Sequence, residues 1–162
     1  MNHIQQTAYE EAINVAAECL QVSKEQINTW LTNHPQVSFI GRMQLLRLVQ
    51  KHGLDPLMGE VTFLQESDHY YPFITIDGWA RLINQHPAYS GMSLRDATEL
   101  KDGIPIWMEC CIYRNDRILP IVVKEYYEEV KTTHVVWQQL PRRMLRHRVI
   151  QQCARLAFGI ST

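Results

Sequence analysis

The stretch PRRMLRHRVIQQCARLAFG, residues 141–159, contains five arginines and no acidic residue. It begins with a proline, which is favoured in the first turn of a helix, and it ends with a glycine, which is favoured just after the last turn. The pattern predicts a helix that starts after Pro141 and ends at Gly159. The helical spacing of four apolar side chains predicts the stripe that packs on the rest of the protein: Leu145, Val149, Cys153 and Leu156.

The five arginines are expected to emerge on more than one side of this helix. Arg148 and Arg155 are seven residues apart and share a face, whereas Arg142 and Arg146 are four apart and share another. Such a helix suits the wall of a groove better than it suits the base-reading helix of a helix-turn-helix protein. The alternative is that these arginines only solvate a helix surface or pair with carboxylates elsewhere in the fold.

Charge is distributed unevenly along the 162 residues, although the net charge is only −1. The last acidic residue is Glu129 and six cationic residues follow it, so residues 130–162 carry +6 and residues 1–129 carry −7. A clustered cationic surface attracts a polyanion, most simply a nucleic-acid backbone. The length, the 46% hydrophobic content and the lack of any linker-like stretch predict a single domain over residues 1–162.

The N-terminal third of the sequence has the patterns of helices. Ser23 followed by Gln26 is typical of a capping box. Ser38 is a favourable first cap for another helix, and Gly53 is a typical stop. Three helices are therefore predicted, at residues 7–20, 24–31 and 39–52.

The middle of the sequence has the patterns of short strands. Two β-type runs, residues 60–65 and 71–76, flank a polar stretch and predict a hairpin. Asp77 is then expected to cap a short helix that Pro87 ends. Three further runs with turn signals between them predict an antiparallel meander, at residues 90–94, 104–113 and 118–123.

The segment before the basic helix, residues 131–140, is predicted to be a loop, and residues 124–130 a helical turn. The loop contains Trp137. A tryptophan in this place could stack on a base or a sugar, as in proteins that bind single strands; a buried structural role is an equal alternative. Together the elements predict an α+β fold with N-terminal helices, a small antiparallel sheet with a hairpin, and a C-terminal basic helix.

The sequence contains no strong motif for binding a metal ion or a nucleotide cofactor. The four cysteines contain no CxxC pair and are typical of reduced, packed thiols in a cytosolic protein. A metal site could be built from His147, Cys153 and another histidine, but side chains six apart on a helix lie on poorly matched faces. The sequence has no H-E-x-x-H motif and no Walker A loop. We therefore expect a protein that is not an enzyme and uses no ATP, with Mg²⁺ only as an ion associated with DNA.

The sequence predicts neither a secretory signal peptide nor a membrane-spanning helix. The N-terminus, MNHIQQTAYEE, is polar and acidic and therefore does not predict a secretory signal peptide. No apolar run approaches the roughly 20 residues that a membrane-spanning helix needs.

Four blocks of the sequence carry a family resemblance. They are GLDPLMGEVTF (53–63), ITIDGWARLINQHPAYSGM (74–92), CCIYRNDRILPIVVKEYYEE (110–129) and PRRMLRHRVIQQCARLAFGI (141–160). In the same order, these blocks resemble the RecT/Redβ family of phage single-strand annealing proteins, and its Redβ branch above all. The resemblance runs from about residue 39 to the end, and the pieces PRRMLRHR and QQCARLAFG are its most specific parts.

The resemblance implies ATP-independent binding of single-stranded DNA and annealing of complementary strands during homologous recombination, in the cytoplasm of a bacterial host. It also implies rings or helical filaments in which DNA, as single strand and as annealed duplex intermediate, lies in a basic groove with its bases open for pairing. Arg142, Arg143, Arg148 and Arg155 would contact phosphates, and Trp137 would lie against the strand. The full predicted DNA-binding set is Arg142, Arg143, Arg146, Arg148, Arg155, Trp137, Lys131, Arg114 and Arg117.

The sequence departs from the family pattern in a few places. Gly59 and Asn115 stand where Redβ proteins have lysines, so a weaker grip on DNA is expected there, and the loop at 130–137 is shorter. The family's C-terminal domain, which recruits a partner exonuclease and the host single-strand-binding protein, is expected to be missing from this sequence.

The sequence also predicts which segments make subunit contacts and leaves two alternative functions open. Subunit contacts are expected from residues 7–31 and 104–126, which have more apolar and acidic surface than the fold of one chain needs. A general nucleic-acid chaperone without a role in recombination is the main alternative function. A metal-dependent enzyme is a less favoured one.

Overall fold

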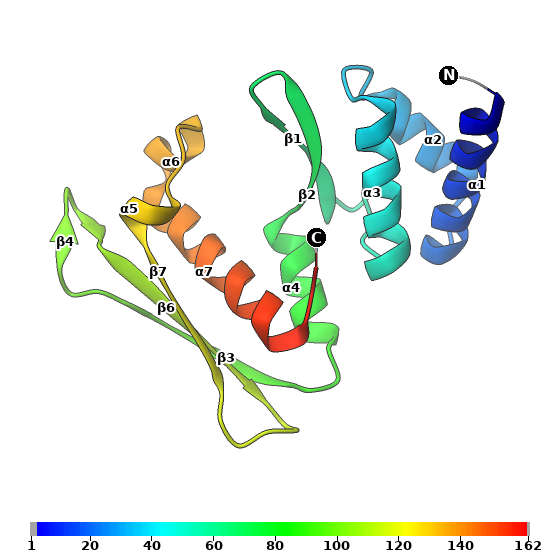
Figure 1. The fold of residues 1–162 in the computed structure, drawn as a ribbon. Helices are drawn as coiled ribbons and strands as arrows, with labels where there is room; N and C mark the ends of the chain where they lie inside the picture. The colour runs from blue at the N-terminus through cyan, green and yellow to red at the C-terminus, as the bar shows by residue number, and fades with distance from the viewer. Residues whose placement is uncertain (1–2, 162) are drawn as a thin grey trace. The chain divides into compact units, whose positions relative to one another are not determined.

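Helices form most of the first half of the chain, together with one β-hairpin (Figure 1). The computed structural model describes residues 3–161, which divide into two compact units between Leu82 and Ile83. The elements that begin in the first unit are α1 (His3–Leu20), α2 (Lys24–Thr32), α3 (Phe39–His52), β1 (Val61–Glu66), β2 (His69–Ile74) and α4 (Ile76–Gln85), which continues across the division.

The cap signals of the first helices are confirmed. The Gln26 amide donates to the Ser23 hydroxyl at 3.2 Å, and the Ser23 amide donates to the Gln26 side-chain oxygen at 2.9 Å, which completes the capping box of α2. Ser38 caps α3, and Gly53 ends it with a left-handed φ of 63°. These ends could be predicted because each depends on contacts within a few residues.

Helix α1 begins earlier than the prediction of residue 7. Its first turn is exposed and polar, so no apolar period marks it. The Thr7 hydroxyl donates to the His3 carbonyl at 3.0 Å, and the Gln6 side-chain amide donates to the Glu10 carboxylate at 2.6 Å. Local polar bonds therefore extend the helix without help from the core.

The core of the first unit lies between the three helices and the hairpin. Helix α1 packs on α2 and α3, and α3 packs on both hairpin strands. Strands β1 and β2 pair in antiparallel register from Val61 opposite Ile74 to Glu66 opposite His69. The side chains buried here include Ile13, Ala16, Ile27, Leu31, Leu45, Leu46, Val49, Leu54, Val61 and Ile74.

Helix α4 is capped by Thr75, and the expectation that Asp77 caps it was wrong. Asp77 lies inside the first turn of the helix. The Thr75 hydroxyl accepts a hydrogen bond from the Gly78 amide at 3.2 Å and donates to the Gly59 carbonyl at 2.8 Å. Asp and Thr are both good caps; Thr75 takes the position because its hydroxyl also reaches the loop before β1.

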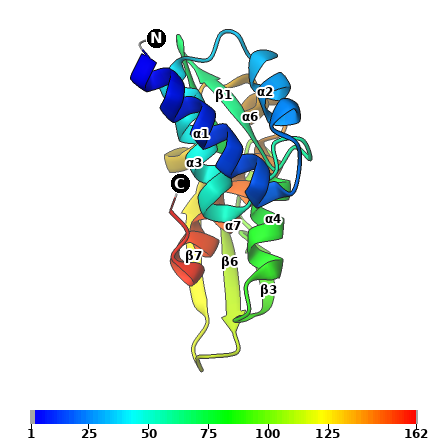
Figure 2. The same cartoon turned by 90° about the vertical axis from the view of Figure 1, so that its right-hand side faces the viewer.

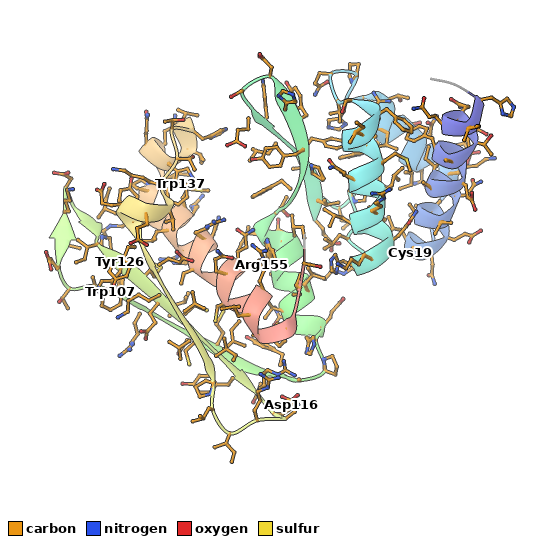
Figure 3. All side chains as sticks on the ribbon, viewed as in Figure 1. Cys19, Trp107, Asp116, Tyr126, Trp137 and Arg155 are labelled. Carbon is orange, nitrogen blue, oxygen red and sulfur yellow. The ribbon has the colours of Figure 1, made fainter. Side chains whose placement is uncertain are left out.

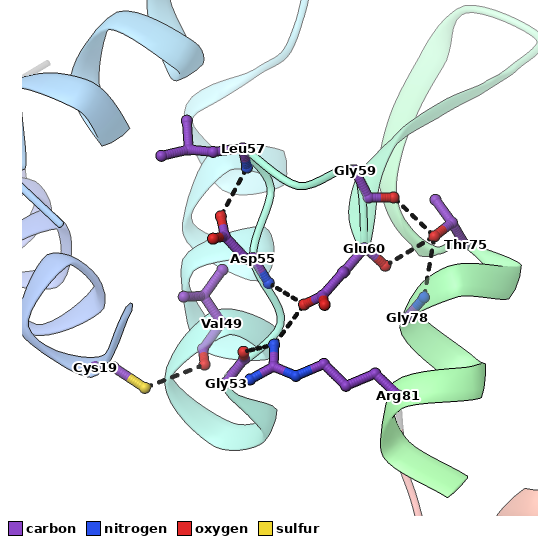
Figure 4. Close-up of polar contacts among 10 residues, drawn as sticks. All are labelled: Cys19, Val49, Gly53, Asp55, Leu57, Gly59, Glu60, Thr75, Gly78 and Arg81. Carbon is purple, nitrogen blue, oxygen red and sulfur yellow. Dashed lines mark hydrogen bonds and ion pairs between the residues drawn. The ribbon is translucent and has the colours of Figure 1, made fainter. Parts of the chain in front are cut away.

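A polar network ties that loop to α4 (Figure 4). The Arg81 guanidinium donates to the Gly53 carbonyl and pairs with the Glu60 carboxylate, which also accepts the Asp55 amide at 2.8 Å. Gly78 lies directly against Glu60, because a Cβ on Gly78 would stand 2.1 Å from the Glu60 carbonyl oxygen. Only glycine therefore allows this close approach.

The second unit contains a three-stranded antiparallel sheet with a long helix on one face (Figures 1 and 2). The strand order is β3-β6-β7, and the helix is α7. Its elements are β3 (Tyr89–Asp96), β4 (Leu100–Lys101), β5 (Ile104–Pro105), β6 (Trp107–Arg114), β7 (Ile121–Tyr126), α5 (Tyr127–Val130), α6 (Val135–Gln139) and α7 (Pro141–Phe158).

The core of this unit lies between β6 and α7. Alternate residues of β6 are buried, as a strand with one covered face requires: Met108, Cys110 and Ile112. The side chains that α7 buries are Leu145, Val149, Ile150, Cys153, Ala154 and Ala157. Leu156, predicted to be buried, is exposed, because the small residues Ala154 and Ala157 take the close contacts instead.

The strands differ from the expected meander at its turns. The run predicted at 104–113 is two strands separated at Ile106, because β5 pairs with β4 in a hairpin of its own. Residues 118–120 lie in the turn between β6 and β7 and not in a strand. Strand β7 continues to Tyr126, so the helical turn predicted from residue 124 is only α5.

The predicted loop before α7 contains a short helix, α6. The His134 imidazole caps it by accepting the Val136 amide at 3.3 Å. The loop prediction was therefore wrong over five residues, since histidine is not one of the usual capping residues from which a helix start is recognised. The predicted ends of α7, Pro141 and Gly159, are confirmed, and Gly159 has a φ of 67°.

Candidate nucleic-acid interface

The N-terminal end of α7 concentrates positive charge. Pro141 is in its first turn, and within the described helix neither a side-chain cap at Leu140 nor an acid in that turn offsets Arg142 and Arg143. Cations here face the positive end of the helix dipole, which costs about 0.3–1 kcal/mol each. Unpaired amides at a helix N-terminus favour anions. A local arrangement that opposes stability is typical of a functional surface.

Two arginines of α7 are exposed and unpaired. Arg143 and Arg146 make no hydrogen bond or ion pair with any residue between 3 and 161. Each guanidinium keeps five N–H donors in a fixed fork whose geometry matches phosphate oxygens. These side chains are therefore available to an anionic ligand without breaking an internal contact.

Two further arginines of α7 are exposed and bind only neutral groups of the protein. The Arg142 Nε donates to the Gly103 carbonyl at 3.0 Å, which attaches the start of α7 to the β4–β5 turn. The Arg155 guanidinium, labelled on α7 in Figure 3, donates to the Gln152 side-chain oxygen at 3.2 Å. Neither contact neutralises the charge, so both side chains add to the positive surface.

Arg148 occupies a more internal position. It is half-buried, and its Nε atom is buried without a hydrogen-bond partner among the described residues. Burial raises the pKa of the Glu125 carboxyl, and the positive charge of Arg148 opposes that rise. Arg148 therefore acts mainly on the interior of the second unit, although it shares a helix face with Arg155.

Lys131 is occupied by an ion pair. Its ammonium lies 2.7 Å from the Glu128 carboxylate, whose other oxygen is 3.2 Å from Lys101. Hydrogen bonds from Lys131 and then Lys101 lower the pKa of Glu128. An exposed pair of this kind is weak and can exchange partners, so the place of Lys131 in the DNA-binding set stays a prediction.

Arg114 is a structural residue in the second unit. Its guanidinium donates to the Ala157 carbonyl in the last turn of α7 and binds both carboxylate oxygens of Asp116. Its side chain is only 13% exposed. The hydrogen bond from Arg114 lowers the pKa of Asp116. Arg117 is half-exposed and lies 3.8 Å from the same carboxylate.

Trp137 lies inside the second unit. It is 7% exposed, and its ring centroid is 6.1 Å from that of Tyr127. Of the two roles open to it from the sequence, the geometry favours the structural one, because neither ring face is free for a base to stack on. The structure thus exposes three arginines in the first two turns of α7 and a fourth, Arg155, in its last turn on another face, and it keeps Trp137, Arg114 and Lys131 in contacts within the protein.

Comparison with known proteins assigns the chain to a family. The model of the RecT family matches residues 14–162. The chain belongs to the RecT family. The match begins well before residue 39, where the sequence blocks suggested that the resemblance starts, and so includes the last part of α1 and all of α2.

The RecT-family chain is also similar to a curated phage protein. It is 34% identical over 128 residues to the protein named "Recombination protein bet" of Escherichia phage lambda. The aligned region covers 72% of this chain and 46% of that relative. The chain therefore spans about half the length of the curated relative that it matches.

Sequence reasoning did not select Arg47, an exposed cation of the RecT-family chain. Arg47 in α3 is exposed and has no ion-pair partner within residues 3–161. A signal was available, because residues 26–54 contain Arg42, Arg47 and Lys51 and no acidic residue. Its exposure in the folded helix identifies it.

No other chemistry is evident in the part of the chain that the structure describes. Among residues 3–161 there is no group of three histidine, cysteine or acidic side chains that could hold a metal. The Cys153 thiol points to the Cys110 carbonyl at 3.4 Å inside the core, away from His147 on the helix. None of the described helices is both long and apolar enough to span a bilayer.

Arg114→Ala tests the structural assignment of this side chain in the RecT-family chain. We expect it to lower the free energy of unfolding measurably, because it removes charged hydrogen bonds to the buried Ala157 carbonyl and to Asp116. Affinity of the folded protein for single-stranded DNA is expected to stay unchanged. Denaturant unfolding and fluorescence anisotropy measure the two effects, with Arg117→Ala as a nearly neutral control. Loss of affinity with unchanged stability would instead return Arg114 to the DNA-binding set.

Proposed function

We propose that this RecT-family chain binds single-stranded DNA through α7 and anneals complementary strands in homologous recombination. The observation that carries the proposal is the set of exposed α7 arginines without acidic partners: Arg142, Arg143, Arg146 and Arg155. Arg142, Arg143 and Arg146 stand in the first two turns of α7, at a helix N-terminus that favours anions, and Arg155 stands in the last turn. The curated relative named for recombination supports the choice of a DNA ligand.

The proposed mechanism is electrostatic. Arginine forks bind phosphates bidentately, and phosphate contacts hold a strand without reading its sequence. Neutralised strands repel each other less, so a second, complementary strand can approach the bases of the first. The free energy then comes from base pairing, and we propose that annealing requires no ATP and uses Mg²⁺ only as a counterion of the DNA.

We propose that the working form is a ring or filament of many copies. One chain of this size contacts only a few nucleotides, whereas neighbouring copies would join their basic helices into one continuous track. Binding along such a track is cooperative. The ligands are single strands and the annealed duplex intermediate held on the same track.

Salt dependence and annealing rate test the proposal together. With four exposed arginines engaged, log K for single-stranded DNA is expected to fall with log salt at a slope of about −3 per subunit, from roughly −0.7 per phosphate contact. Two unrelated oligonucleotide sequences of equal length should bind alike. Purified protein should accelerate pairing of long complementary strands without ATP, measured by fluorescence quenching.

Two results would refute this function. A flat salt response would exclude phosphate contacts as the source of affinity. Binding without accelerated pairing would indicate a general nucleic-acid chaperone that only covers strands.

A further inference from the structure

The turn between β6 and β7 presents two large apolar side chains to solvent. Ile118 is 99% exposed and Leu119 is 77% exposed. Figures 1 and 2 show that this turn projects beyond the end of α7 in the second unit, and Asp116 marks it in Figure 3. Single exposed apolar residues are ordinary, but two adjacent ones at a projecting tip are typical of an interaction site. We call residues 115–120 the tip.

The tip is held at its β6 end by hydrogen bonds and an ion pair. The Asn115 amide donates to the Ala88 carbonyl at 3.0 Å, and the Asn115 side chain donates to the Pro87 carbonyl at 3.0 Å. At the same end, Arg114 binds the Asp116 carboxylate. These bonds fix the β6 end of the tip, immediately before the exposed Ile118 and Leu119.

A pocket of complementary character lies in the first unit. It has a volume of about 350 Å³ and is lined by Glu25, Gln26, Thr29, Trp30, Asn33 and Leu57. This volume is near the lower end of the range of ligand pockets, roughly 300–1,000 Å³, and the pocket is widely open to solvent. We call it the α2 pocket, because α2 supplies most of its lining.

The apolar wall of the α2 pocket is fixed. The Trp30 ring packs on His34 with centroids 4.3 Å apart and on Phe63 with centroids 5.6 Å apart. Trp30 remains half-exposed, so one side of the ring is open to the pocket. Tryptophan in a preformed pocket is the residue type that most often dominates a protein interface.

The charges at the two surfaces are opposite. Glu25 is the only charged residue among the described residues that line the α2 pocket. Arg117 stands next to Ile118 in the tip and is half-exposed. Asp116, the acid in the tip, is already neutralised by its two bonds to Arg114. A tip that enters the α2 pocket therefore brings Arg117 toward Glu25.

We propose that the tip of one copy of this chain docks in the α2 pocket of a second copy. The two surfaces differ, so the contact is head-to-tail, and each added copy offers a new free tip or pocket. Such contacts generate rings or filaments. The inference rests on the assembly proposed above and supplies its partner surfaces. Neither surface includes an arginine of α7, so DNA binding and docking can fail separately.

A complementation experiment tests the docking. The tip variant is I118S with L119S, and the pocket variant is T29R, which fills the pocket from an exposed helix position and repels Arg117. Wild-type protein with single-stranded oligodeoxythymidine is expected to form species larger than dimers in mass photometry. Each variant alone should stay monomeric. An equimolar mixture should form dimers and nothing longer, because only one intact tip and one intact pocket remain per pair.

The control is Ile40→Ser, which removes another exposed apolar side chain, from α3, and is expected to leave assembly unchanged. Circular dichroism shows that each variant is folded. Three results would overturn the proposal: a monomeric wild type, a folded variant that assembles normally, or a mixture that gives no dimers. Wild-type protein that assembles without binding the oligonucleotide would support the docking and refute the proposed function.

Discussion

A chain in which Arg143 and Arg155 are both replaced by alanine is expected to bind single-stranded DNA at least about 100-fold more weakly than the wild type at low salt. Hydrogen bonds to charged groups contribute about 1.5–3 kcal/mol each, and about 1.4 kcal/mol corresponds to a factor of ten. Both side chains are exposed, and neither pairs with an acid in the described residues. Stability should therefore change little, and annealing should be lost together with binding.

The control variant removes the same amount of charge from other surfaces. Lys24→Ala with Arg95→Ala deletes one exposed cation from α2 and one from β3, where Arg95 pairs with Glu109. Fluorescence anisotropy with a short oligonucleotide should show near wild-type affinity for this control. If both double variants lose affinity equally, net charge and not α7 determines binding. If the α7 variant binds normally, the interface lies elsewhere.

Gly78→Ala is expected to destabilise the first unit by about 3 kcal/mol or more, at the upper end of the usual cost of overpacking. The new Cβ would stand 2.1 Å from the Glu60 carbonyl oxygen and 2.8 Å from the Ile74 Cγ2 atom. The loop before β1 would have to move away from α4. The hydrogen bonds that Thr75 makes with that carbonyl, at 3.1 Å and 3.2 Å, would then be lost.

Urea unfolding followed by circular dichroism measures this effect. Gln85→Ala is the matched control, because Gln85 is exposed at the end of the same helix and its replacement should stay within about 0.5 kcal/mol. A Gly78→Ala protein as stable as the control would mean that the contact between α4 and the Glu60 loop is looser than the structure shows.

The helices could be predicted where their signals are local. The ends at Ser23, Ser38, Gly53 and Gly159 each depend on a side chain or a φ angle that acts within a few residues. The cap of α4 could not be predicted in this way. Thr75 and Asp77 are equally suitable by type, and the choice depends on a bond from the Thr75 hydroxyl to a loop sixteen residues earlier.

The candidate site could be predicted only as a region. The excess of arginine after Glu129 is visible in the composition and falls mostly on α7. Which arginines are free is a property of the fold, since Arg114 is bound by Ala157, forty-three residues away. Trp137 shows the same limit, because its burial depends on packing that its neighbours in sequence do not reveal.

Helix α7 both covers the core of the second unit and carries its exposed arginines. This has a consequence for folding during protein synthesis. The strands β3 to β7 leave the ribosome before α7, with Met108, Cys110 and Ile112 still uncovered. Domains fold as units once their elements are available. The second unit can therefore become compact only when the arginines of α7 have also been translated. A nascent chain acquires its fold and its positive surface in the same step.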